Sequence, residues 1–326
     1  MKWVLRILGA VFAVIFIALI VMRVPDTDPA QMRAKYGGEP SQYIELSDGL
    51  TVHLRDEGPK SGAPEDPEGD APAIILLHGS NADLSTWDAW ADDLSQDYRV
   101  IRYDQIGHGL TGPATNDDYQ VESFTQDLDE IADRLELDSF VLAGNSMGGA
   151  IAMHYAITHP ARLDGLVLVD AGGAAIKQEG GGNLAFTLAR IPGLSSVLAT
   201  VMPRSLADRS LRQSVSNQDI VTEEMVDRYW EMARYPGNRA ATLKRFSTPR
   251  SALNAGDVAA VTVPTLVMWG EEDSLIRYEA AKWYMDQLPN ATLANYPGIG
   301  HLPHEEAADA TIADLRAWLA GLQPAE

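Results

Sequence analysis

The alternation of hydrophobic and polar positions divides most of the chain into short strand-like runs and longer helix-like segments. The strand-like runs are apolar, as buried parallel strands are. They cover Tyr43–Leu46, Leu50–Arg55, Ala73–Leu77, Tyr98–Tyr103, Ser139–Ala143, Gly165–Val169, Thr265–Trp269 and Ala291–Tyr296. Segments with apolar residues at helical spacing follow most of the later runs: Thr86–Leu94, Val121–Leu135, Gly148–Thr158, Tyr278–Leu288 and Ala307–Leu322. This alternation predicts an α/β fold whose sheet is mostly parallel, doubly wound and covered by helices on both faces.

One long stretch interrupts the alternation. About 95 residues between Val169 and Thr265 contain no strand-like run. They contain helical patterns over Asn183–Ala189, Leu206–Ser214, Thr222–Ala233 and Arg239–Phe246. A connection of this length indicates an insertion. Because it leaves the sheet at the carboxyl ends of the strands, where ligands bind in such folds, we interpret it as a helical cap.

The N-terminal segment is apolar without interruption from Ile7 to Met22. Counted from Trp3 to Val24, it reaches the roughly 20 residues that span a bilayer as a helix. A cleaved signal peptide is the alternative, but its apolar region is usually about 7–15 residues and ends at a small-x-small site. We therefore predict a retained N-terminal transmembrane helix. The basic residues closest to it favour a cytoplasmic N-terminus and a periplasmic or other extracytoplasmic catalytic part.

These segments give the predicted domain organisation. Residues 1–24 are the membrane anchor, 25–42 a tether, 43–172 the first part of the α/β core, 173–260 the helical cap, and 261–326 the second part of the core. The stretch from Glu57 to Pro72 is rich in Pro, Gly and acidic residues, so we expect a solvated loop there.

Composition narrows the candidate partners and chemistries. The net charge of −21 disfavours nucleic acid, because phosphate binding needs clustered Lys and Arg. There is no cysteine among the 326 residues, which excludes disulfides, a thiol nucleophile and Cys-based metal sites. Nothing in the sequence implies a metal or an organic cofactor.

The candidate nucleophile lies in the pentapeptide Gly144-Asn145-Ser146-Met147-Gly148. This Gly-x-Ser-x-Gly match directly follows a predicted strand and directly precedes a predicted helix. The turn between them is expected to be sharp, and the glycines allow the neighbouring backbone to pass close by. The Ser146 hydroxyl then stands at the positive end of a helix, which favours developing negative charge.

A serine needs a base and an acid that orients the base. His301 lies in the loop between the last predicted strand and the C-terminal helix, at the edge of the sheet where Ser146 is expected; His304 is its rival. Asp273 follows the run Thr265–Trp269 and is placed to orient the histidine, with Asp170 as the alternative. We predict a Ser146, Asp273, His301 triad. The His-x-x-His spacing alone does not indicate a metal site.

Acyl transfer also needs hydrogen-bond donors for the oxyanion. The backbone N–H of Met147 is one, and the loop His78-Gly79-Ser80-Asn81 supplies the other. We assign the second donor to Ser80, with Asn81 as the alternative. His78 is expected to hold this loop by hydrogen bonds.

From about Tyr43 to Leu322 the chain resembles the α/β-hydrolase fold superfamily. The resemblance rests on the Ser146 turn, on HGSN at 78–81, on DQIGHG at 104–109 and on the segments around Asp273 and His301. The sequence GNSMGG is similar to that of meta-cleavage-product C–C hydrolases and of many esterases. Branches that use an aspartate nucleophile are disfavoured, because Ser146 stands at that position.

The resemblance and the motifs together imply a serine hydrolase of carboxylesterase type acting on a small, hydrophobic ester. The alternatives are C–C bond hydrolysis with the same triad, a cofactor-free haloperoxidase-like side reaction, and a catalytically silent binding protein. Candidate substrate contacts are Asn81, Asn145, Phe186 and Trp230, within a cap whose other apolar residues are Leu188, Met225, Tyr229 and Met232. Arg190 and Arg250 are candidate partners for a substrate carboxylate.

Overall fold

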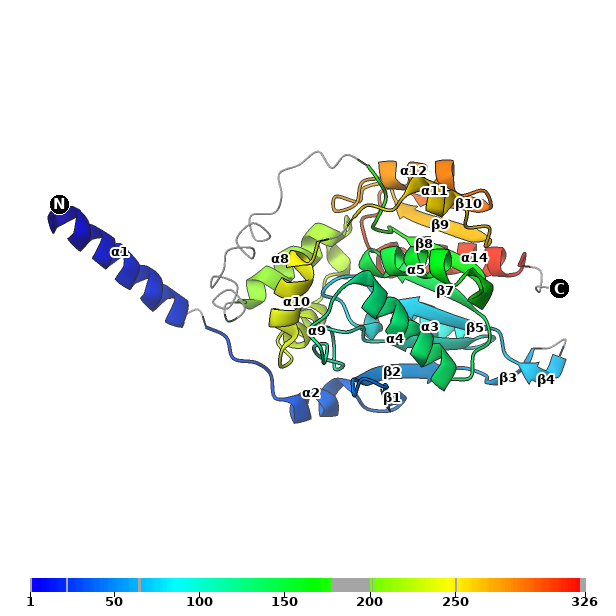
Figure 1. Cartoon of the computed structure of the whole chain (residues 1–326), viewed down its shortest axis with the longest axis horizontal. Helices are drawn as coiled ribbons and strands as arrows, with labels where there is room; N and C mark the ends of the chain where they lie inside the picture. The colour runs from blue at the N-terminus through cyan, green and yellow to red at the C-terminus, as the bar shows by residue number, and fades with distance from the viewer. Residues whose placement is uncertain are drawn as a thin grey trace.

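The computed structural model describes residues 2–21, 23–63, 66–176, 200, 202–249 and 251–322. Within them a mostly parallel eight-stranded sheet runs in the order β1-β2-β6-β5-β7-β8-β9-β10 (Figure 1). The strands are β1 (Ser41–Glu45), β2 (Thr51–Glu57), β5 (Ala73–Leu77), β6 (Arg99–Tyr103), β7 (Phe140–Asn145), β8 (Leu163–Val169), β9 (Thr265–Gly270) and β10 (Ala291–Tyr296). The pairs β1–β2 and β2–β6 are antiparallel, and every other pair is parallel. The predicted α/β fold is confirmed.

Helices cover both faces of the sheet because the central strands are apolar on both sides. In β5, Ile75 and Leu77 pack into one hydrophobic cluster while Ile74 and Leu76 pack into the other. The first cluster lies under α4 (Val121–Arg134), α5 (Met147–Thr158), α11 (Ala255–Ala259) and α12 (Glu279–Gln287). The second lies under α3 (Asp88–Leu94) and α14 (Ala308–Leu319). Successive side chains of β5 thus point to opposite faces of the sheet, and each face is covered by a layer of helices.

The described part of the insertion, which we call the cap, is helical. It contains α8 (Arg204–Ser214), the 3-10 turn η3 (Gln218–Ile220), α9 (Glu223–Ala233) and α10 (Asn238–Ser247). Figure 1 shows these helices together beside one end of the sheet. The predicted helix Asn183–Ala189 lies outside the described residues, as do Phe186, Leu188, Arg190 and Arg250.

Three sequence predictions differ from the structure. The expected loop Glu57–Pro72 contains an antiparallel pair, β3 (Ser61–Ala63) and β4 (Asp66–Asp70), formed by backbone pairing that a polar sequence does not reveal. The expected tether contains α2 (Pro29–Tyr36), which is capped by Asp28 through its bond from Ala30 N–H (2.8 Å). The expected helix Ala307–Leu322 is preceded by a separate short helix, α13 (Pro303–Glu306), and ends at Leu319.

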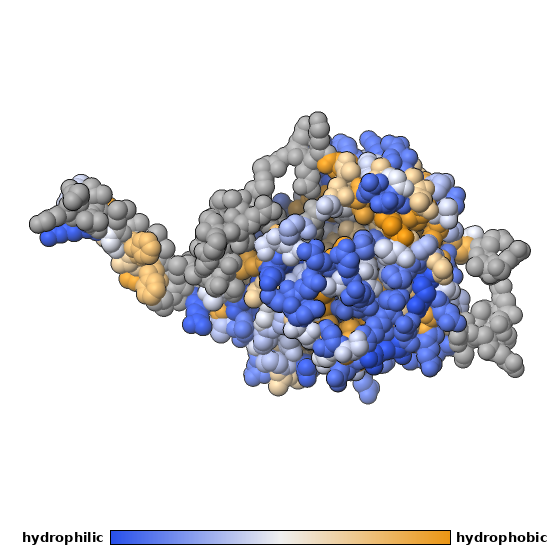
Figure 2. Space-filling view, in the orientation of Figure 1, coloured by the Kyte–Doolittle hydropathy of each residue, from blue (hydrophilic) through white to orange (hydrophobic). Residues whose placement is uncertain are grey.

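The apolar N-terminal segment forms helix α1 (Lys2–Val21), which extends away from the globular part in Figure 1. No helix built from described residues is long and apolar enough to cross a membrane. The predicted transmembrane helix is therefore not supported by the structure; several side chains of this segment lie outside the description. Figure 2 shows a mostly hydrophilic face over the globular part, in line with the net charge of −21.

Candidate active site

Ser146 occupies a strained turn between β7 and α5. Its φ of 55° and ψ of −113° lie far from the helical and strand conformations of its neighbours. Its N–H donates to the Val169 carbonyl (3.0 Å), and its own carbonyl accepts from Gly172 N–H (2.8 Å). A Cβ on Gly148 would lie 2.2 Å from the Leu77 carbonyl oxygen, so the turn requires glycine there. This backbone conformation places the partly exposed Ser146 side chain at the N-terminus of α5.

His301 and Asp273 form a buried pair at the same edge of the sheet. The Nδ1–H of His301 donates to Asp273 Oδ2 over 2.6 Å. The other oxygen of Asp273 accepts from the backbone N–H groups of Leu275 (2.7 Å) and Ile276 (3.0 Å). Because Nδ1 carries the proton in this arrangement, His301 Nε2 is left as an acceptor and can act as a base.

Asn145 connects the nucleophile turn to the histidine loop. Its side-chain amide donates to the carbonyl of His301 (3.1 Å) and to that of Val169 (3.2 Å). The side chain is buried and directed to backbone groups. This predicted substrate contact therefore acts in the structure as a brace that holds Ser146 and His301 near each other.

His304, the alternative base, and Asp170, the alternative acid, have surroundings that differ from those of His301 and Asp273. His304 Nε2 is bonded to Thr86 Oγ1 (3.0 Å), and its ring packs on Trp87 with centroids 4.2 Å apart. Burial, helped by the proximity of His301, lowers the pKa of His304 to about 3, so the ring stays neutral. Asp170 is buried directly behind Asp273 and accepts from Gly270 N–H (3.2 Å).

One group of side chains among the described residues could offer three metal ligands within 4.8 Å, namely Asp170, Asp273 and His301. The His301 and Asp273 atoms in it already share a hydrogen bond of 2.6 Å. Two ligands of one ion do not hydrogen-bond to each other, so this arrangement fits a proton-sharing pair better than a metal centre.

The two residues predicted to supply the oxyanion donors, Ser80 and Met147, are in contact with each other. The hydroxyl of Ser80 donates to the sulfur of Met147 (3.4 Å), which places the two residues in contact. A Cβ on Gly79 would lie 3.2 Å from the Cβ of Ser146, so the loop passes directly over the nucleophile. His78 holds this loop as expected, because its Nδ1–H donates to the Gly79 carbonyl (2.8 Å) and its Nε2 accepts from Gln105 N–H (3.1 Å).

The comparison with known families agrees with this geometry. Residues 72–308 match the model of the alpha/beta hydrolase fold family. The chain belongs to the α/β hydrolase fold family. The 2-hydroxy-6-oxo-2,4-heptadienoate hydrolase of Pseudomonas putida is 30% identical over 245 residues, which are 72% of this chain and 80% of that protein.

Solved structures share the fold of this α/β hydrolase. A meta-cleavage product hydrolase from Pseudomonas fluorescens IP01 superposes with a TM-score of 0.72 at 23% identity, over 86% of this chain and 98% of the other. A membrane phospholipase A superposes with a TM-score of 0.75 at 22% identity, over 100% of both chains. At these identities the two likenesses bear on the fold alone.

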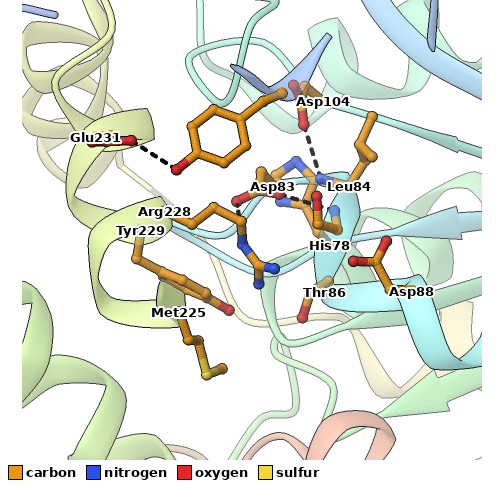
Figure 3. Close-up of polar contacts among 12 residues, drawn as sticks. His78, Asp83, Leu84, Thr86, Asp88, Asp104, Met225, Arg228, Tyr229 and Glu231 are labelled. Carbon is orange, nitrogen blue, oxygen red and sulfur yellow. Dashed lines mark hydrogen bonds and ion pairs between the residues drawn. The ribbon is translucent and has the colours of Figure 1, made fainter. Parts of the chain in front are cut away.

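The cap of this α/β hydrolase contacts the loops that carry the candidate site. The last residue of α8, Ser214, accepts at its carbonyl from His301 N–H (2.8 Å). In α10, Arg245 Nη2 donates to Asn81 Oδ1 (3.2 Å), so the amide of Asn81 is bound to the cap. Figure 3 shows Arg228 and Tyr229 of α9 directed at the loop after β5, where Arg228 Nε lies 3.4 Å from Asp83 Oδ2. These contacts place the cap over the carboxyl ends of the strands.

Trp230 of α9 has a different neighbourhood from the one predicted. Its indole N–H donates to the Met202 carbonyl (2.7 Å), and the Arg234 guanidinium lies 3.7 Å from its ring centroid. Both contacts are within the cap. The sequence named Asp170 only as an alternative to Asp273, from its position directly after a strand. The cap contacts of Arg228 and Arg245 were missed, and no signal in the sequence indicated them.

Proposed function

We propose that this α/β hydrolase is a serine hydrolase that cleaves a carboxylic ester through a Ser146–His301–Asp273 triad. The observation that supports it most is the 2.6 Å bond between His301 Nδ1–H and Asp273 Oδ2, next to a strained serine at a helix N-terminus. A buried carboxylate that fixes the tautomer of a histidine beside such a serine is the arrangement of nucleophilic acyl transfer.

In the proposed reaction His301 Nε2 takes the proton of Ser146 Oγ as the oxygen attacks the substrate carbonyl. The N–H groups of Met147 and Ser80 donate hydrogen bonds to the oxyanion and so stabilise its developing negative charge. Asp273 stabilises the imidazolium without taking its proton. His301 then protonates the leaving alcohol. In the second half of the reaction His301 deprotonates a water molecule, which attacks the acyl-enzyme carbonyl, and the acid is released as His301 returns the proton to Ser146 Oγ.

C–C bond hydrolysis is the second candidate, because the relative from Pseudomonas putida that is 30% identical is a hydrolase of 2-hydroxy-6-oxo-2,4-heptadienoate. The triad would serve either reaction. What separates them is the substrate: a dienoate carries a carboxylate and needs a cationic contact, whereas a neutral ester does not. Asn145, which precedes the nucleophile, is directed to backbone carbonyls and does not distinguish the two.

The deciding experiment follows hydrolysis of p-nitrophenyl esters of increasing acyl length beside decay of a coloured dienoate substrate. It uses the unaltered chain and the Ser146→Ala variant. Ester turnover that Ser146→Ala abolishes supports the proposal, and its dependence on acyl length measures the apolar space under the cap. Dienoate turnover without ester turnover favours the second candidate. No turnover of either by the folded protein contradicts both and favours a silent binding protein.

We further propose that α1 attaches the enzyme to a membrane. Its described apolar side chains Phe12, Val14, Phe16 and Ile17 are all exposed, and no charged residue occurs from Ile7 to Met22.

The attachment is tested by fractionating cells that express the full chain or a chain starting at Asp26. The full chain is expected to stay with membranes through a high-salt wash, and the shortened chain to leave them. Protease added outside the cytoplasm is expected to reach the catalytic part. Recovery of the full chain without membranes contradicts the attachment, and N-terminal sequencing then tests whether a signal peptide was removed.

A further inference from the structure

Asp170 lies directly behind the triad acid and has no part in the reaction described above. It follows β8 with a φ of 43°, and its N–H donates to the Met268 carbonyl (3.0 Å). Its side chain is fully buried. One oxygen of Asp170, one of Asp273 and a ring nitrogen of His301 lie within 4.8 Å of one another. The triad therefore contains a second carboxyl group away from solvent.

Two buried carboxyl groups this close do not both ionise, so one of them holds a proton. The hydrogen-bond donors decide which. Asp273 accepts from His301 Nδ1–H and from the N–H groups of Leu275 and Ile276. Within the described residues Asp170 accepts one backbone N–H, that of Gly270. Donors stabilise the charged form, so Asp273 is the carboxylate and Asp170 the neutral acid.

The surroundings of Asp170 favour the same assignment. Burial raises the pKa of Asp170 well above its usual range, and the charge of Asp273 and a hydrogen bond with it act in the same direction. Glu306 of α13 adds negative charge nearby. Burial, more than any other cause, raises the pKa of Tyr296 in β10, so its phenol stays neutral and adds no negative charge beside Asp170. His301 faces the pair from its loop and is bonded to Asp273.

We propose that Asp170 is a positioning residue that stays protonated and donates its O–H to the Asp273 carboxylate. The inference rests on the proposed function, because it assigns a role within that triad. The bond keeps Asp273 turned toward His301 and limits the triad to one negative charge. Asp170 transfers no proton during the reaction.

The pH profile of kcat/KM distinguishes a neutral from an ionised Asp170. Asp170→Asn replaces a neutral donor by another neutral donor, so kcat is expected to stay within about threefold and the acidic limb to stay in place. Asp170→Ala removes the donor, so kcat is expected to fall about tenfold at unchanged KM, with the acidic limb moved to higher pH. Asp127→Asn, which removes a half-buried carboxyl outside the triad, is the matched control and is expected to leave the profile unchanged.

Two results would overturn the proposal. Movement of the acidic limb to lower pH in Asp170→Asn would show that a negative charge had been removed beside His301. Equal losses in Asp170→Asn and Asp170→Ala would show that the donor has no role.

A measurement that needs neither turnover nor a variant covers the case of a misfolded variant or an inactive enzyme. Carbon-13 spectra of the chain labelled at aspartate Cγ are recorded at about pH 8.5, where an ordinary aspartate with a pKa of about 3.9 is ionised. Asp127, whose pKa burial raises to about 7, is then largely ionised as well. One protonated aspartate is expected, and none contradicts the proposal. A protonated aspartate in a chain without ester turnover would leave Asp170 assigned while removing the proposed function.

Discussion

The described residues contain two groups of a serine, a histidine and an aspartate whose surroundings differ. The first is the proposed catalytic triad, in which His301 Nδ1–H donates to Asp273 and the His301 carbonyl accepts from Asn145, next to Ser146. In the second, His53 Nδ1 is bonded to Asp104 Oδ2 (2.7 Å) and His53 Nε2 to Ser41 Oγ (2.8 Å). We call the second arrangement, Ser41–His53–Asp104, the strand triad.

The acids of the two arrangements are alike, and the serines are not. Asp104 is buried and accepts from the backbone N–H groups of Leu84 (2.8 Å) and Leu110 (2.7 Å), much as Asp273 accepts from two backbone N–H groups. Ser41 is an ordinary residue of β1, paired with Arg55 of β2, whose Nε donates to Ser41 Oγ (3.3 Å). Ser146 stands in a strained turn, at a helix N-terminus, under the loop that contains Ser80.

The difference shows that a hydrogen-bonded chain of these three residue types is not sufficient for catalysis. A His–Asp pair is also a good way to satisfy buried polar groups, and in the strand triad it ties β2 to the loop after β6. What distinguishes the proposed catalytic triad is the backbone at Ser146, a strained turn at the N-terminus of α5, where N–H groups can stabilise a developing oxyanion.

The largest expected effect is on turnover in the catalytic arrangement. Ser146→Ala is expected to lower kcat for esters by about 10⁴-fold or more without changing the unfolding temperature, because the nucleophile is lost and the fold is not. Steady-state kinetics and thermal unfolding check it. Residual activity above a tenth of the original would place the nucleophile elsewhere.

Asp273→Asn is expected to lower kcat by up to about 10⁴-fold, because an amide at this position favours the wrong tautomer of His301. Asp104→Asn in the strand triad is the matched control, with kcat expected within about fivefold of the unaltered chain. Parallel losses in both variants would contradict the division of roles between the two arrangements.

In the strand triad the expected loss is in stability. His53→Ala is expected to lower the free energy of unfolding by about 3 kcal/mol, because it leaves the buried Asp104 without its ionisable partner. Urea denaturation measures it, and ester turnover of the folded fraction should change little. A stable variant that lost its turnover would make His53 a member of the active site.

The fall of the unfolding free energy in acid is expected to depend on the ionisation of Asp104. Burial alone would raise its pKa, but the charge and the hydrogen bond of His53 outweigh burial and lower the pKa of Asp104 below its usual range. A lowered folded-state pKa gives stability that is present above the unfolded value of about 3.9 and is lost as pH falls through the folded value. The unfolding free energy of Asp104→Asn is therefore expected to fall less steeply below about pH 4, and an unchanged slope would contradict this.

The smallest expected effect is that of Ser41→Ala. It removes one hydrogen bond to His53, so a loss of about 1 kcal/mol is expected, with kcat within about twofold. Chemical denaturation and ester kinetics measure the two quantities. A large loss of turnover would mean that the strand triad takes part in catalysis.

The proposed catalytic triad could be named from the sequence because its signals are local. Strand β5 was predicted with the bounds that the structure has, and Ser146 was found from a turn motif between a strand and a helix. Asp273 and His301 each follow a predicted strand, and parallel strands bring their carboxyl ends to one edge. The same reasoning left Asp170 as an alternative acid, since it too follows a strand.

The strand triad and the cap contacts had no such signals. Ser41 and His53 meet across an antiparallel pair whose register depends on the whole sheet, so their spacing in the sequence carries no information. Arg228 of α9 reaches Asp83 only because the cap docks on the core. Helix α2 and the strands β3 and β4 were missed because short polar elements are held by capping and backbone pairing, which hydrophobic periodicity does not reveal.

The most direct test of the account is to label the unaltered chain with a fluorophosphonate and locate the modified residue by peptide mass spectrometry. A serine hydroxyl activated by a histidine attacks the phosphorus of such a reagent, fluoride leaves, and the serine oxygen stays bonded to phosphorus in a stable adduct. We expect modification at Ser146, lost in Ser146→Ala and His301→Ala and kept in Ser41→Ala. Modification at Ser41, or at neither serine in the folded chain, would contradict the assignment of the active site.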